Sequence, residues 1–270
     1  MYLNLDDYGK SITHSDLWVT SHDKLSDFYA SSWQPGEAPV PLLVMRLILA
    51  SAALGILVWS VTVSPTPTWL VFLTNWGLVL VAMTTLNGLV LSCIALCRKN
   101  MDGDGLPWFV STYWFLFNVS VTIAIMITAL YWILIYDPEP EDPESHDLWL
   151  DIGTHAVNSL IMLAELLATR TPIRFLHLYQ PLGMGLCYAA FSAIYYVAGG
   201  TVNGFPYIYE VLDWRQAKRA GAIVGGAAAG VIIIYAFLWG LALCRDKIST
   251  SLIRTTSHDL APVPPDRHMA

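Results

Sequence analysis

Four polar residues lie in a stretch that is otherwise apolar enough to cross a bilayer, Leu148 to Ala168. They are Asp151, His155, Asn158 and Glu165. On a helix that turns about 100° per residue, all four fall within an arc of about 80°. Ionisable groups that face lipid are costly, so this polar face must turn toward protein or water. We therefore expect the other helices to surround it, and any chemistry to depend on what faces His155.

A threonine in the second apolar segment is expected at the same depth as this histidine. Thr74 lies about 8 Å into its segment and His155 about 10 Å into its own, at 1.5 Å per helical residue. A neutral imidazole can take the proton of a threonine hydroxyl and make it a nucleophile. Asp151 or Asn158, each about one turn away, could orient the ring. This predicts a site suited to hydrolysis of an acyl lipid ester.

The same residues also have a purely structural interpretation. Threonine hydroxyls in membrane helices commonly bond their own backbone, and a buried histidine can simply satisfy a neighbouring helix. Glu165 lies deeper than His155, and Arg46 of the first segment is expected at a similar depth. These two are therefore predicted to form a structural ion pair. The alternative is that Glu165 belongs to a proton or ion path.

The elements that must position these residues are membrane spans. Of the 270 residues, 55% are hydrophobic and 13% are charged, whereas about 25% are charged in soluble domains. Six segments are apolar and long enough to cross a bilayer: Val40 to Val63, Trp69 to Leu96, Trp108 to Tyr136, Leu148 to Ala168, Leu176 to Ala198, and Gly221 to Cys244.

This pattern predicts an all-α polytopic membrane protein, a bundle of six transmembrane helices. The bundle is predicted to form one domain, residues 39–245. A polar N-terminal tail, residues 1–38, precedes it. A polar, proline-containing tail, residues 246–270, follows it and is predicted to be disordered.

Basic residues predict the orientation of the bundle. The two tails and the links after the second and fourth spans hold most of them: Lys10, Lys24, Arg98, Lys99, Arg170, Arg174, Arg245, Lys247, Arg254 and Arg267. The opposite side holds Arg215, Lys218 and Arg219. Lys and Arg favour the cytoplasmic side, so both termini are predicted to be cytoplasmic and the acidic segment at residues 137–147 exoplasmic. The protein is expected in the plasma membrane or an endomembrane.

Several classes of function find no support in the sequence. The net charge is −7 and there is no basic arm, so a nucleic-acid partner is not expected. The motifs GxSxG, GxxxxGK[ST], HExxH and CxxC are absent, and no cofactor or metal ion is predicted. Membrane lipids, with a lipid ester among them as substrate, are the expected partners.

Small residues predict how the helices pack. The sixth span has GxxxG spacings at Gly221/Gly225 and Gly226/Gly230, which favour close helix contact. One face of the second span is small and polar: Thr74, Gly77, Val81, Thr85, Gly88 and Ser92. The cysteines lie within or at the edges of apolar segments, at positions 93, 97, 187 and 244. They are predicted to be packing residues, with S-palmitoylation near the span ends as the alternative.

Five short motifs make the chain resemble the rolling stone family of multi-pass membrane proteins. They are FLTNWG (72–77), ITALYW (127–132), THAVNS (154–159), FSAIYYVAGG (191–200) and IYEVLDW (208–214). The resemblance covers about residues 40–245. The namesake family is associated with myoblast fusion in insect muscle, so the resemblance implies a role at the cell surface.

The family is similar, more distantly, to the androgen-induced and androgen-dependent membrane hydrolases. Those use a Thr and a His within the membrane to cleave fatty acid esters of hydroxy fatty acids. By position in the second and fourth spans, the resemblance implies that Thr74 and His155 correspond to them. The first hypothesis is thus an intramembrane Thr/His hydrolase of lipid esters. The second is a non-enzymatic protein of cell–cell contact or myoblast fusion, and a transporter is third.

Overall fold

The computed structural model of the protein describes residues 17–19, 22, 24–63, 65–98, 106–136 and 148–254. Within these residues the chain is helical apart from turns, links and two isolated β-bridges. The α-helices are α1 (Val40–Val63), α2 (Leu73–Cys97), α3 (Trp108–Leu130), α4 (Leu148–Ile152), α5 (Asn158–Ala168), α6 (Tyr179–Val197) and α7 (Ala217–Ser249). The predicted all-α fold is confirmed.

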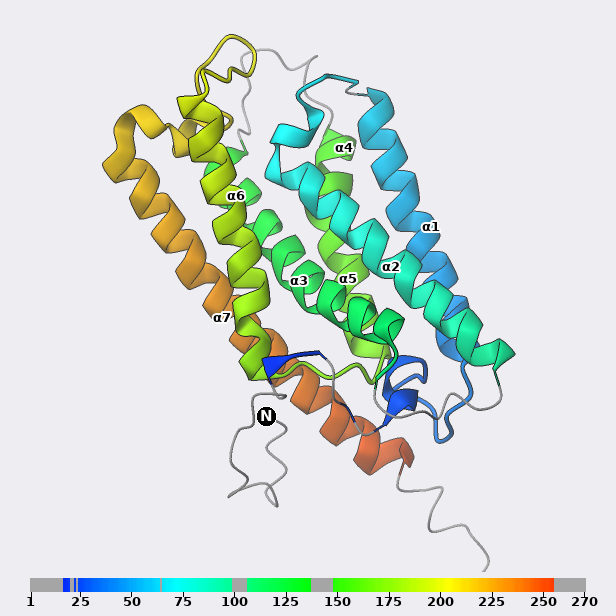
Figure 1. Ribbon diagram of the computed structural model, residues 1–270. Helices are drawn as coiled ribbons and strands as arrows, with labels where there is room; N and C mark the ends of the chain where they lie inside the picture. The colour runs from blue at the N-terminus through cyan, green and yellow to red at the C-terminus, as the bar shows by residue number, and fades with distance from the viewer. Residues whose placement is uncertain are drawn as a thin grey trace, which may run out of the picture.

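Five helical segments of the described chain are long and apolar enough to cross a membrane. One of them is Leu148–Ala168, in which α4 and α5 are joined by a π-helical turn. Another is Trp108–Ile135, in which α3 continues through a second π-helical turn. α6, with 19 residues, is not among the five. It packs against α3 and α7 and completes the six-helix bundle (Figure 1).

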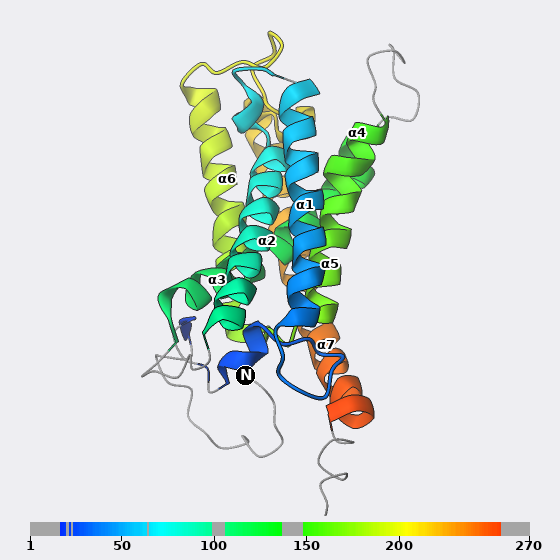
Figure 2. The ribbon, with the colours of Figure 1, turned by 90° about the vertical axis from the view of Figure 1, so that its right-hand side faces the viewer.

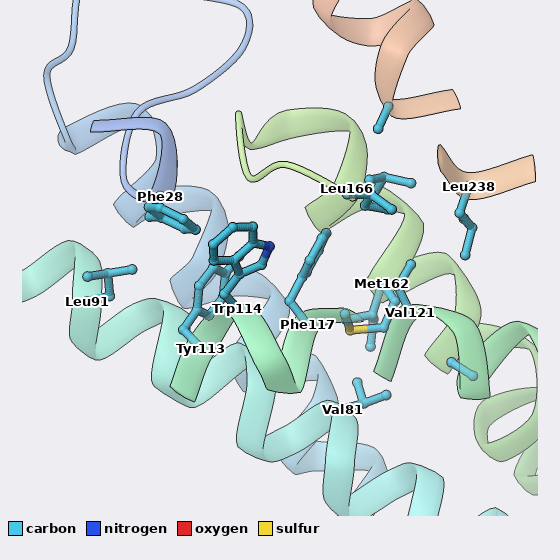
Figure 3. Packing of buried hydrophobic residues seen from close by; sticks show 14 of the residues in the cluster. Phe28, Val81, Leu91, Tyr113, Trp114, Phe117, Val121, Met162, Leu166 and Leu238 are labelled. Carbon is cyan, nitrogen blue, oxygen red and sulfur yellow. The ribbon is translucent and has the colours of Figure 1, made fainter. Parts of the chain in front are cut away.

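α3 is the central helix of the bundle. It packs against α2, α5, α6 and α7, and its Trp114 and Phe117 have no exposed surface. Figure 3 shows the Phe117 ring between Trp114 and the side chains of Met162 and Leu166 of α5. Lipid tails are as apolar as these side chains, so close van der Waals packing is what stabilises this core.

The two described ends of the chain lie at the same end of the bundle. Figures 1 and 2 show the N-terminal segment and the last turns of α7 together there, beside the end of α2. The links from α1 to α2 and from α6 to α7 lie at the opposite end, with the start of α4. The acidic segment at residues 137–147, predicted to be exoplasmic, lies outside the described residues.

The N-terminal segment is part of the folded unit from Lys24 onward, which corrects the predicted tail of residues 1–38. Phe28 is fully buried in the main core. Ser32 donates its hydroxyl proton to the backbone oxygen of Thr169 at 2.7 Å. Arg170 Nε donates to the backbone oxygen of Ser31 at 2.9 Å. The sequence-based boundary was wrong because it followed polarity, while this segment is held by the buried Phe28 ring and by hydrogen bonds from side chains to backbone carbonyls.

The predicted disordered tail also begins too early. α7 runs to Ser249 and is followed by a π-helical turn, Thr250–Arg254. Arg245 is buried and donates to the backbone oxygens of Leu166 and Thr171, at 2.7 and 3.2 Å. These carbonyls end α5 and follow it, so the charged end of α7 ties two helices together. Residues 246–254 are therefore helical.

Exposed positions on α7 and on other helices correct two packing predictions. A Cβ atom placed on Gly221, Gly225 or Gly226 would meet no other atom within 4 Å. Only the next glycine of the pattern, Gly230, lies close to a neighbour, with a Cβ 3.1 Å from Met126 of α3. Close contact along the GxxxG spacings is therefore wrong for most of this face. The four cysteines are exposed, so they are not packing residues inside the bundle.

The small face of α2, by contrast, is buried as predicted. Val81, Thr85 and Ser92 expose 1% or less of their surface. A Cβ on Gly88 would lie 3.0 Å from the Tyr113 ring and 3.1 Å from Nε of Arg46. Glycine at this position lets the guanidinium of α1 approach the backbone of α2.

Two leucine substitutions distinguish the buried face of α2 from the exposed glycine face of α7. Gly88→Leu is expected to destabilise the protein by about 1–3 kcal/mol, because the side chain overfills a packed site. Gly226→Leu points into open space and is expected to change stability by about 0.5 kcal/mol or less. Thermal unfolding of both variants in one detergent measures the difference. Equal losses would show that α7 packs as tightly here as α2.

Candidate active site

Thr74 and His155 lie in hydrogen-bond contact. Oγ1 of Thr74 is 3.2 Å from Nε2 of His155. Thr74 is the second residue of α2, and His155 is in the π-helical turn Gly153–Val157 between α4 and α5. The structure thus brings together the two residues singled out by depth. Their catalytic role stays a prediction.

The π-helical turn that carries His155 is supported from two sides. Such turns loosen the regular backbone hydrogen bonds of a helix and occur often at functional sites. Thr128 of α3 donates its hydroxyl proton to the backbone oxygen of His155. On the other side, a Cβ on Gly153 would lie 3.2 Å from the ring of Trp59 in α1. The turn is therefore clamped between α1 and α3.

The hydrogen bonds around the ring decide which nitrogen carries the proton. Nδ1 of His155 lies 3.1 Å from the backbone oxygen of Asp151 and 3.0 Å from Oγ1 of Thr154. The Thr154 hydroxyl donates its proton to the backbone oxygen of Leu150 at 2.8 Å, so toward the ring it accepts. Nδ1 must therefore be the donor. In the neutral ring Nε2 then presents a lone pair to Thr74, as a general base requires.

The two residues predicted to orient the ring are placed differently. Asp151 contacts it, through its backbone oxygen and with its carboxylate 3.7 Å from Nδ1. Asn158 instead donates from Nδ2 to the backbone oxygen of Thr154 at 3.0 Å. Asn158 thus supports the helix that carries His155. The predicted single polar face assumed a regular helix, and the π-helical turn changes the register between these residues.

The deeper polar residue of this span forms the predicted ion pair. Nε of Arg46 donates to Oε1 of Glu165 at 2.8 Å, and both side chains are fully buried. The Tyr113 hydroxyl donates to the same Oε1 at 2.6 Å and accepts from Nη2 of Arg46 at 2.7 Å. Nη1 bonds the Gly88 carbonyl and the Ser92 hydroxyl, each at 2.9 Å. These contacts give the pair a structural role.

Two tyrosines that the sequence reasoning did not select complete the surroundings. The Tyr131 ring stacks on His155, with centroids 3.5 Å apart and planes 4° from parallel. Tyr209, from the link between α6 and α7, accepts the backbone N–H of Leu73 at 2.9 Å. Burial raises the pKa of Tyr209, so its phenol keeps a proton to donate at neutral pH. Tyr131 lies in the motif ITALYW and Tyr209 in the motif IYEVLDW, but the residue spacing within these motifs does not indicate a role at this site.

Two pockets meet at this site. The first is polar and lies at the end of the bundle near the α1–α2 link, with an empty volume of about 1270 Å³ including its open part. Its walls include Asp151, His155 and Glu210. The second is apolar, lies between α3, α6 and α7, and has an empty volume of about 960 Å³ on the same measure. Thr74 and Tyr131 line both.

The arrangement offers a nucleophile, a base in the correct tautomer and a polar space joined to an apolar one. The positive end of the α2 dipole lies next to Thr74 and favours developing negative charge. Within the described residues, no three His, Cys, Asp or Glu side chains lie close enough to hold a metal ion.

Fold and site together define an integral membrane protein with several spans and a polar cavity at one end of its bundle. The sequence model described as "Protein rolling stone" matches residues 3–262, so the chain belongs to the rolling stone family. It is 28% identical over 232 residues to "Protein rolling stone" of Drosophila melanogaster, covering 82% of this chain and 84% of that protein. No solved structure matches the chain. The family resemblance inferred from the motifs is confirmed.

Proposed function

We propose that this protein is an intramembrane hydrolase of lipid esters, with Thr74 as the nucleophile and His155 as the general base. The observation that supports it most is the 3.2 Å contact between Oγ1 and Nε2. It lies where a polar pocket and an apolar pocket meet. A lipid ester has this same division, with an apolar chain on one side of the carbonyl and an alcohol on the other.

The reaction follows from the hydrogen bonds. Nε2 of His155 takes the Thr74 proton while Oγ1 attacks the ester carbonyl. The negative charge on the carbonyl oxygen develops beside the positive end of the α2 dipole and the phenol of Tyr209, which supplies a donor. His155 returns the proton to the departing alcohol and leaves an acyl-threonine. Water, deprotonated by His155, then releases the fatty acid and restores the hydroxyl.

The direct test is catalysis by the purified full-length protein in nanodiscs. Release of fatty acid from a panel of acyl esters, and labelling by a fluorophosphonate probe of Ser/Thr hydrolases, are the expected results. Absence of both would reject the hydrolase. The Thr74–His155 contact would then only tie α2 to the π-helical turn, and the non-enzymatic contact protein would be the better proposal.

Two single substitutions test which of the two residues near the His155 ring contributes to catalysis. Asp151→Asn removes the charge that stabilises the imidazolium but keeps the backbone oxygen on Nδ1, so kcat is expected to fall about tenfold, or about 1.4 kcal/mol. Asn158→Ala does not touch the ring and is expected to keep kcat, with some loss of thermal stability. Steady-state kinetics on one ester measure both. A larger loss of kcat in Asn158→Ala would reverse these roles.

We further propose that both termini face the cytoplasm, in the plasma membrane or an endomembrane. The support is the bias of Lys and Arg toward the end of the bundle that holds both described chain ends. Glu141→Cys is expected to react with a membrane-impermeant maleimide in intact cells, with Ser251→Cys as the unreactive control. A reactive Ser251→Cys beside a silent Glu141→Cys would invert the orientation.

A further inference from the structure

The apolar pocket has the shape and lining of a site for a hydrocarbon chain. Its wall on α3 and the π-helical turn that follows extends from Ile123 to Ile135, which is at most about 18 Å at the α-helical rise of 1.5 Å per residue. None of its lining residues is charged. Thr74 lines both this pocket and the polar one, so a chain in the apolar pocket can end beside the Thr74 hydroxyl.

The wall of the pocket on α6 and α7 includes small and exposed residues. Gly185 and Leu186 line it from α6, and Val224 and Ala228 from α7. Leu186 is 50% exposed, and a Cβ on Gly185 would meet no atom within 4 Å. Open space lies next to Gly185, where a larger side chain would cover this wall. A chain lying in the bilayer can therefore enter from the side.

The polar pocket restricts what the other half of the ligand can be. Its charged lining residues are both acidic, Asp151 and Glu210. No Lys or Arg is among the residues that line it. A group that carries a carboxylate or phosphate would meet like charge there without a cationic partner. A neutral hydroxylated group can instead bond the same carboxylates and the Asn75 side of the pocket.

We propose that the ligand of this double pocket is a long-chain fatty acyl ester of a neutral alcohol such as glycerol. The acyl chain occupies the apolar pocket after entry between α6 and α7. The ester carbonyl lies at Thr74, and the alcohol occupies the polar pocket. This assignment rests on the proposed hydrolase for turnover, but the chain-binding pocket is a property of the bundle and is measured by binding alone.

The binding test uses a monoacylglycerol whose acyl chain carries a diazirine and an alkyne. It is photo-crosslinked to full-length Thr74→Ala protein in phosphatidylcholine nanodiscs, and the label is mapped by peptide mass spectrometry. Label is expected in the lining segments of α3 and α7. Ala228→Phe, which fills the pocket, is expected to reduce it roughly tenfold. Ala229→Phe is the matched control, because residue 229 is exposed and does not line the pocket.

A second filling variant, Val224→Trp, guards against misfolding of the first. Both variants must keep the thermal stability of the Ala229→Phe control. Label that maps elsewhere, or that survives both changes, overturns the acyl site even if the wild type hydrolyses esters. If the label depends on residues 224 and 228 but the wild type shows no ester hydrolysis, the acyl site is supported and only the hydrolase is rejected.

Competition separates the two kinds of alcohol. Unlabelled monoacylglycerol is expected to displace the probe at a concentration roughly tenfold lower than an ester of the same acid with an anionic hydroxy acid. Glu210→Lys, which reverses one charge of the polar pocket, is expected to reduce the difference between the competing concentrations of the two esters. Stronger competition by the anionic ester in the wild type overturns the assignment of a neutral alcohol.

Discussion

Thr74→Ala and His155→Ala are each expected to lower kcat for ester hydrolysis on the order of 10³-fold or more. The first change removes the attacking oxygen, and the second removes the acceptor of its proton. Because the two residues act in one step, the double variant is expected to be little worse than either single variant. Independent contributions would multiply instead, to roughly 10⁶-fold.

The controls for this experiment come from the same helix. Thr74→Ser keeps a hydroxyl at 74 and is expected to retain part of the activity. Thr85→Ala also removes a buried hydroxyl of α2, one that bonds the Val81 carbonyl at 2.9 Å. It is expected to cost stability of about 1–3 kcal/mol at most while kcat stays unchanged. Equal turnover by Thr74→Ala and wild type, with both folded, would reject Thr74 as the nucleophile.

Features set by composition and by depth could be predicted from the sequence. The length of each apolar segment fixed where the helices lie, since an unpaired backbone cannot stay in lipid. A constant rise per residue placed Thr74 and His155 at one level, which their contact requires. Arg46 and Glu165 were paired by the same reasoning, because two opposite charges buried at one depth have few other partners.

Features set by distant contacts could not be predicted. The π-helical turn at Gly153–Val157 depends on Thr128 and Trp59 from other helices. The sequence of the turn itself does not distinguish it from an α-helix. The stack of Tyr131 on His155 depends in turn on such a turn in each of the two spans. Hydrophobic periodicity reports neither, because it assumes 3.6 residues per turn throughout.

Glycine spacing and polarity misled for a related reason. Lipid and protein neighbours are equally apolar, so a GxxxG pattern does not say which of them covers the face at Gly226. Polarity likewise does not distinguish a free tail from a segment such as the one at Ser32, whose polar groups bond the end of α5. In both cases the deciding information is the identity of the neighbour.

Glu165→Ala is expected to be the most destabilising single change in the bundle, with a loss of about 3–5 kcal/mol. It leaves the guanidinium of Arg46 buried, with Gly88, Ser92 and Tyr113 as partners but without a counter-charge. Arg46→Met should cost a similar amount, because it strands the carboxylate. The double variant Arg46→Met/Glu165→Ala is expected to be more stable than either single variant, since it removes both desolvated charges at once.

Glu165→Gln is the matched control for the loss of charge alone. It keeps an acceptor for the Tyr113 hydroxyl and removes only the charge, so it is expected to fall between wild type and Glu165→Ala. Thermal unfolding in one detergent of wild type, Arg46→Met, Glu165→Ala and their double variant forms a double-mutant cycle and gives the coupling energy. Because the pair lies deeper than His155, kcat per folded molecule should stay near wild type. Additive losses, or a loss of kcat without a loss of stability, would instead make Glu165 part of a proton or ion path.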